Sequence, residues 1–182
     1  LNGTISDGLS WSASNSITGH QALTQGDNIA TSYGFGTANG NLVAGGADEL
    51  VSFLQVIAAG GAVTIDLMSI TNILQQSGVM LARLKGYKIR LLAASGKGAI
   101  DAVNGTACSS VQVGNAATSA NALELGAATH TYRINSGGSH QHFDPSAAGF
   151  AAVTGSAKNV LITNNDGSVA AAVQVTLIGA TT

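Results

Sequence analysis

The chain has 182 residues, of which 9% are charged, and its 7 Lys and Arg against 9 Asp and Glu give a formal net charge of -2. This length predicts one well-filled domain that buries roughly 70% of the surface its unfolded form exposes. The charge balance lacks the basic footprint of a nucleic-acid-binding protein, so we expect no DNA or RNA partner. A mean hydropathy of +0.29 excludes disorder caused by low hydrophobicity.

Small uncharged residues take the place of the lysines and glutamates that usually hydrate the surface of a monomer. The charged share of 9% compares with about 25% in ordinary globular domains. A neutral surface of this kind suits a subunit that hides much of itself against neighbours. No run approaches the roughly 18 to 20 apolar residues that span a bilayer, so we expect a soluble chain with no membrane partner.

Residues 1–47 are dominated by Gly, Ser, Asn and Thr, with widely spaced apolar residues between them. We predict an extended N-terminal arm, because so few anchors bury too little surface to offset the entropy of the chain unaided. Its aromatic residues Trp11, Tyr33 and Phe35 are the interface candidates that would hold the arm on another subunit. The alternative is a loop-rich edge that packs on its own domain.

Short strand-like runs separated by Gly, Asn and Ser clusters fill residues 48–182, which we take as one β-sandwich domain. We expect strands near residues 49–58, 62–68, 79–93, 109–113, 129–135, 139–143, 158–163 and 172–178. Eight short antiparallel strands is the number found in a jelly roll. The predicted fold class is therefore all-β, an antiparallel, jelly-roll-like β-sandwich with an extended N-terminal arm.

Turn residues predict how some of these strands are connected. Ala59-Gly60-Gly61 favours a hairpin between the first two strands, because paired glycines accept positive φ. Asn164-Asn165-Asp166-Gly167 favours a second hairpin between the last two. The apolar register shifts near Gly86, which a β-bulge would explain. Residues 69–76 have apolar spacing that allows one or two helical turns, and Asp66 before them is expected to cap or close a turn.

The segment His140-Gln-His142-Phe-Asp144 is the metal-site candidate. On a strand, positions 140, 142 and 144 share one face, so two imidazoles and a carboxylate would meet a Zn, Fe or Mn ion, as in cupin-type jelly rolls. A cupin motif also needs a downstream His and Glu, which the sequence lacks, and nothing places His130 near the pair. We therefore favour a polar turn or rim segment, and predict no metal and no cofactor.

No other pattern in the chain indicates catalysis, so we predict that the protein is not an enzyme. There is no Gly-x-Ser-x-Gly context, and the single Cys108 is expected to be a buried small apolar residue. The basic residues of one strand-like run are interpreted as a solvated or interfacial sheet face instead of a phosphate site. These residues are Arg83, Lys85, Lys88 and Arg90.

Several short motifs, taken together in order and spacing, resemble those of small structural proteins encoded among tailed-phage and prophage genes. The resemblance covers about residues 45 to 180 and leaves the N-terminal arm least matched. Its motifs are Asp48-Glu49-Leu50, Val63-Thr-Ile-Asp-Leu67, Arg83-Leu-Lys85 with Tyr87-Lys-Ile89, Gly137-Gly138 before Phe143-Asp144-Pro145, and Val175-Thr-Leu-Ile-Gly179.

This resemblance implies a virion structural protein, a capsid decoration or cement protein on the outer capsid surface. Its implied partners are the major capsid protein and copies of itself, as a trimer, and it supplies no catalytic residues. Three other classes stay open: a host-binding or glycan-binding head fibre or tail appendage domain, a subunit of an extracellular filament, and a cupin-like metalloenzyme. A filament differs from a decoration protein in symmetry, because its assembly is open instead of closed.

Overall fold

All secondary structure in the described part of this computed structural model is β-strand. The structure describes the backbone of residues 2–15 and 23–36. It describes both backbone and side chains of residues 47, 49–71, 77–92, 108–144, 146 and 149–181. These residues contain no helix, and therefore none long and apolar enough to cross a bilayer. The all-β fold class predicted from the sequence is confirmed.

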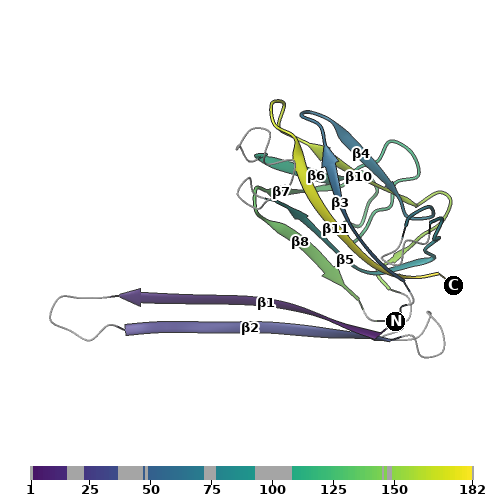
Figure 1. The fold of residues 1–182 in the computed structure, drawn as a ribbon. Coiled ribbons are helices and arrows are strands. Elements are labelled where there is room, and N and C mark those ends of the chain that lie inside the picture. The colour runs from purple at the N-terminus through teal and green to yellow at the C-terminus, as the bar shows by residue number, and fades with distance from the viewer. Residues whose placement is uncertain are drawn as a thin grey trace.

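Two antiparallel sheets pack face to face, as Figure 1 shows. The first has the order β3 (Glu49–Ile57), β11 (Ala171–Ala180), β5 (Arg83–Leu91) and β8 (Ser139–Phe143). The second has the order β4 (Ala62–Asp66), β10 (Asn159–Asn164), β6 (Ser110–Gly114) and β7 (Thr131–Asn135). The short β9 (Ala151–Ala152) pairs with β5 beyond the end of β8.

The connectivity of these sheets is that of a jelly roll. Successive strands from β3 to β6 alternate between the sheets, β6 and β7 are neighbours in one sheet, and β8, β10 and β11 alternate again. The last strand, β11, therefore lies between β3 and β5 in the centre of its sheet. The predicted jelly-roll-like sandwich is confirmed, and all eight predicted strands overlap strands of these two sheets.

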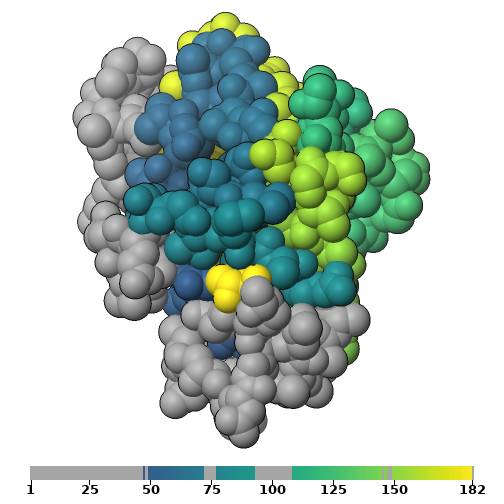
Figure 2. Space-filling view, turned by 90° about the vertical axis from the view of Figure 1, so that its right-hand side faces the viewer, coloured from purple at the N-terminus to yellow at the C-terminus, as the bar shows by residue number. Residues whose placement is uncertain are grey.

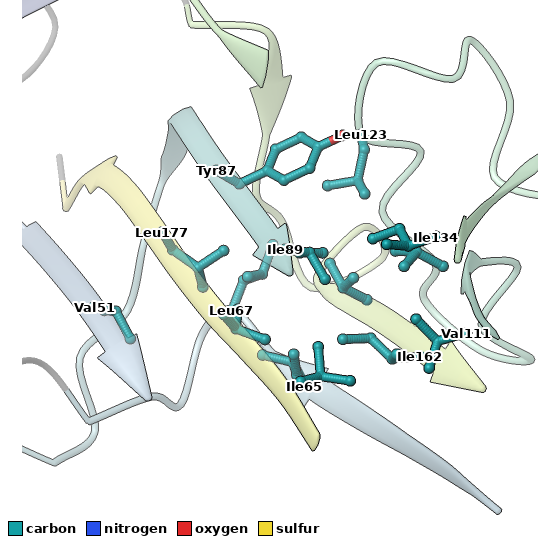
Figure 3. Close-up of a cluster of buried hydrophobic side chains, with 14 of the residues drawn as sticks. Val51, Ile65, Leu67, Tyr87, Ile89, Val111, Leu123, Ile134, Ile162 and Leu177 are labelled. Atoms are coloured by element: carbon teal, nitrogen blue, oxygen red, sulfur yellow. The ribbon is translucent and has the colours of Figure 1, made fainter. Parts of the chain in front are cut away.

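Alternation along the strands builds the core between the sheets. In β10 every second residue is buried, which puts Val160 and Ile162 inside, and the apolar residues of β11 lie against them. Figure 3 shows side chains of both sheets meeting there, among them Leu67, Ile89 and Ile162, all fully buried. Each such aliphatic side chain contributes about 1.5–3 kcal/mol through removal from water.

A bulge in β5 confirms the register shift predicted near Gly86. Ile178 of β11 lies opposite Gly86, whereas the next residue, Gly179, lies opposite Leu84, so Lys85 is the extra residue. The extra residue lets both Leu84 and Tyr87 face the core. Glycine is required at position 86, because a Cβ there would lie 2.5 Å from Cδ1 of Phe143.

Both predicted hairpins are wrong, because each turn joins strands of different sheets. Gly60 does adopt a positive φ of 63°, but β3 and β4 belong to opposite sheets. The same holds for β10 and β11 on either side of residues 164–167. The two turns bond to each other instead: the N–H of Gly60 donates to the carbonyl of Asp166 at 2.7 Å. They are neighbouring arches that close one end of the sandwich.

Within the predicted arm, the backbone forms an antiparallel hairpin of β1 (Asn2–Asn15) and β2 (Leu23–Gly36). No strands were expected in this extended arm. In Figure 1 the hairpin runs as a separate two-stranded ribbon outside the two sheets. The helical turns expected at residues 69–76 lie mainly outside the described residues; at the near end, Ile70 forms an isolated β-bridge with Val79.

Candidate functional site

The interface candidates Trp11, Tyr33 and Phe35 lie in the paired strands of the hairpin. Trp11 is opposite Asp27, Tyr33 is opposite Ile5, and Phe35 is opposite Gly3. Directly opposite residues of an antiparallel pair share a face, and so do residues two apart along a strand. The register therefore places all three aromatic positions on one face of the hairpin.

This face collects most of the large apolar positions of the hairpin, and we call it the apolar hairpin face. Besides the three aromatic positions it holds Ile5, Leu9, Leu23 and Ile29. The opposite face contains Ser, Thr, Gly and Asn positions with a single alanine, Ala30. The apolar hairpin face also carries the polar positions Asp7, Gln25 and Asp27. A two-stranded sheet is at best marginally stable in water by itself, so this hairpin gains stability from a surface on which to pack.

The metal candidates are not brought together as a ligand set. His140 and His142 share one face of β8, as predicted; they lie opposite Ile89 and Tyr87, so this is the inner face. Asp144 lies beyond the strand, where its Oδ1 accepts the N–H of Ser146 at 2.8 Å, and this bond lowers the pKa of its carboxyl. Within the described residues, no three His, Cys, Asp or Glu side chains are placed to share a metal ion.

His140 instead belongs to a polar cluster with Tyr87, Glu124 and Tyr132, at the edge where β8 and β7 meet. His140 Nε2 lies 2.7 Å from Glu124 Oε1, and the Tyr87 hydroxyl donates to the same oxygen. The His140 ring stacks on that of Tyr132, with centroids 4.1 Å apart and an interplanar angle of 36°. Three segments, β5, β8 and the loop before β7, are thereby joined through one carboxylate.

The loop that carries Glu124 is held in place by Asn121. Asn121 is buried and its Nδ2 donates to the carbonyls of Ala152 and Ala157, at 3.1 and 2.9 Å. Its Oδ1 accepts the N–H of Leu123 at 2.9 Å, and Leu123 has a positive φ of 50°. Such a backbone conformation costs about 1–2 kcal/mol in a non-glycine residue, so it persists because these bonds determine it.

Electrostatics favour the hydrogen bonds to Glu124 Oε1, whereas Glu124 Oε2 and the Tyr132 hydroxyl are buried without a hydrogen-bond partner among the described residues. Burial raises the pKa of the hydroxyls of Tyr87 and Tyr132 far above the ordinary value, so Tyr87 stays protonated as a donor. Burial alone would raise the pKa of Glu124, but the hydrogen bonds from His140 and Tyr87 outweigh it and the net shift is downward. The sequence offered no signal for this cluster, because Glu124 lies in a loop.

The other residues singled out in the sequence have structural surroundings. Lys88 and Arg90 are exposed on the outer sheet face, whereas Lys85 in the bulge is fully buried, so the basic residues do not form one patch. Cys108 is buried as predicted, and its thiol donates to Asn164 Oδ1 at 3.1 Å. Asp66 closes a turn as predicted, since its Oδ1 accepts the N–H of Met68 at 2.9 Å.

A hollow of about 280 Å³ opens on the opposite side of the sandwich, between the edge strands β3 and β4. Phe53 and Gln55 line it from β3, and residues 63–66 line it from β4. Figure 2 looks onto this side, where residues of these two edge strands appear in blue. Polar side chains in its lining include Thr64, Asp66 and Ser69.

Comparison with protein families, curated proteins and solved structures finds no match to this chain.

Proposed function

We propose that this chain is a non-enzymatic virion structural protein, a capsid decoration or cement protein that stabilises the shell through intersubunit contacts. The observation that carries the proposal is the apolar hairpin face, beside a rigid jelly-roll body with few charges. In this proposal the hairpin lies across the major capsid protein or a neighbouring copy, and the sandwich is the body that it tethers.

The length of the hairpin supports a tethering role. Each strand has 14 residues, which at about 3.4 Å per residue extends over about 48 Å. That reach exceeds the diameter of a small domain, which is about 30 Å. A hairpin of this length can contact a second subunit along its whole apolar face.

The composition of the chain supports an assembled location. With 9% charged residues, the protein has few groups that would keep its surface hydrated as a lone monomer. Weak contacts repeated around a closed ring of copies give high avidity without any single tight contact. A trimer on the outer capsid surface would use the hairpins in this way.

Binding to shells assembled from the major capsid protein of the same genome tests the proposal. The variant replaces Trp11, Tyr33 and Phe35 together by Ser, and the matched control replaces Ser10, Ser32 and Thr24, on the other face, by Ala. We expect co-sedimentation of the wild type and the control with the shells, and loss of binding of at least about 100-fold in the triple variant.

Deletion of residues 1–45 should abolish shell binding while the circular dichroism of the β-sandwich is retained. Native mass measurement should give three times 18.0 kDa for the wild type, or six times where two trimers associate. Shell binding that survives both the deletion and the triple substitution would contradict the role of the hairpin. Absence of shell binding by the wild type, with adsorption to host cells or to a glycan array, would replace the proposal by that of a host-binding appendage.

A further inference from the structure

Among the strands that the structure describes, none pairs with the outer edge of β3, whose other edge pairs with β11. Val56 lies opposite Ala172 of β11. The carbonyl of Ala172 accepts the N–H of Leu92, which follows β5, so the backbone groups of Ala172 point towards β5 and away from β3. In an antiparallel ladder the N–H and C=O of one residue point the same way, and the direction alternates along the strand. The backbone groups of Leu50, Ser52, Leu54 and Val56 therefore point away from β11.

The residues of β3 themselves lack the features that normally protect an edge strand. Residues 50–57 contain no charge, no proline and no break in their register with β11. Two large apolar side chains flank the edge on the outer face: Leu54 is 50% exposed and Val56 is 48% exposed. One side chain covers part of the edge, because Gln55 Nε2 donates to the carbonyl of Val56 at 2.9 Å. A long uncharged edge with exposed apolar neighbours is a surface for another strand.

We propose that β3 pairs antiparallel with β3 of a second copy, about a two-fold axis at Phe53, to join two sheets into one. The four outward-pointing residues select this register. Leu50 then lies opposite Val56 of the second copy and Ser52 opposite Leu54, so all four exchange hydrogen bonds in both directions. A shift of the axis to Ser52 or Leu54 leaves one of the four unpaired, and a shift to Val51 or Gln55 leaves two.

The side chains of β3 fit a second copy of the same strand in this register. On the outer face, Leu50 meets Val56 and Ser52 meets Leu54, which covers the two exposed apolar residues. On the inner face, Phe53 meets its own copy as a non-hydrogen-bonded pair, the closer kind of pair in a ladder. Glu49, the charged residue of β3, lies at opposite ends of the ladder in the two copies, so no like charges face each other.

Disulfide trapping tests the register. In Phe53→Cys the two thiols face each other across the axis, with Cα atoms about 4.5 Å apart, a distance at which a disulfide forms. In the control Ser52→Cys the equivalent atoms lie more than about 7 Å apart, beyond disulfide reach. We expect a covalent dimer under mild oxidation for Phe53→Cys, and none for Ser52→Cys or for the wild type, whose Cys108 is buried. Equal cross-linking of both variants would overturn the register.

Proline substitution tests the pairing itself. Leu54→Pro removes an N–H that points away from β11, so the sandwich keeps its own hydrogen bonds. Thr64→Pro is the matched control, because Thr64 has the same outward position on the edge strand β4. In sedimentation equilibrium between about 1 and 100 μM, we expect Leu54→Pro to weaken dimerisation at least tenfold and Thr64→Pro to leave it unchanged.

The pairing of β3 does not depend on the proposed role of the hairpin, and the full chain separates the two. The triple substitution of the apolar hairpin face should leave the cross-link at position 53 intact, whatever happens to shell binding. A wild type that is monomeric at about 100 μM would overturn the proposal. So would association that is lost in the triple variant and unchanged in Leu54→Pro.

Discussion

Replacing Asn164 by alanine should destabilise the sandwich more than any change at a neighbouring surface position. Asn164 is 2% exposed and lies at the end of β10, beneath the two arches. Its Nδ2 donates to the carbonyls of Ala58 and Val169, at 3.0 and 2.7 Å. Its Oδ1 accepts the N–H of Asp166 at 2.9 Å and the thiol of Cys108 at 3.1 Å.

The size of the effect follows from the groups that lose their partner. Alanine leaves two carbonyl oxygens and one N–H without this amide, and each buried group left unsatisfied costs about 1–3 kcal/mol. Water can satisfy some of these groups, because parts of the turns are exposed, so we expect the free energy of unfolding to fall by about 3–5 kcal/mol. For a chain of this length that loss lowers Tm by about 6–20 °C.

Urea unfolding followed by circular dichroism measures this loss, with Asn165→Ala as the matched control. Asn165 is exposed, and its Nδ2 makes one hydrogen bond, of 3.3 Å to Ser110 Oγ. Its replacement should cost less than about 1 kcal/mol. If Asn164→Ala costs no more than Asn165→Ala, the amide does not hold the arches and the reasoning is refuted.

Three further expectations follow from the fold. Gly86→Ala should lower the free energy of unfolding by about 1–3 kcal/mol in urea, because its Cβ meets Phe143. The control Gly155→Ala has open space around its Cβ and should change that free energy by less than about 0.5 kcal/mol. Equal effects of the two substitutions would refute the close approach at position 86. The lowered pKa of Glu124 means that its ionised form stabilises the fold above the ordinary value of 4.5, and that this contribution is lost as pH falls through the folded value. Between about pH 6 and pH 3 the unfolding free energy should therefore fall more steeply for the wild type than for Glu124→Gln, and parallel curves would contradict this. Burial raises the pKa of the Cys108 thiol. At about pH 8 a thiol reagent should therefore label the native protein at least tenfold more slowly than the unfolded protein. Similar labelling rates would show that the thiol is accessible in the native protein.

The strands could be predicted because their signal is local. In β5 the alternation of Tyr87, Ile89 and Leu91 with charged residues reports one buried face, and the shift of that alternation at Gly86 reports the bulge. Both are consequences of the two-residue period of a strand. The number of such runs was enough to indicate a jelly roll.

The connections could not be predicted, because turn residues determine a reversal and not the sheet that the next strand joins. Gly60 supplies the positive φ that its turn needs, and the same local geometry serves a hairpin or an arch. The choice between a hairpin and an arch depends on Asn164 and Asp166, which bond the two turns together. More than 100 residues separate these two turns in the chain. The Glu124 cluster was missed for the same reason, because its partners come from three separate segments.

The central position of β11 affects how this protein is made in the cell. Its two neighbours, β3 and β5, are synthesised long before residues 171–180, and neither has a partner on that side until β11 appears. The nascent chain on the ribosome therefore exposes one unpaired side of β3 and one of β5 until β11 is available. A chain truncated before β11 lacks the central strand of this sheet, so it is a substrate for chaperones and proteases instead of a competitor for assembly.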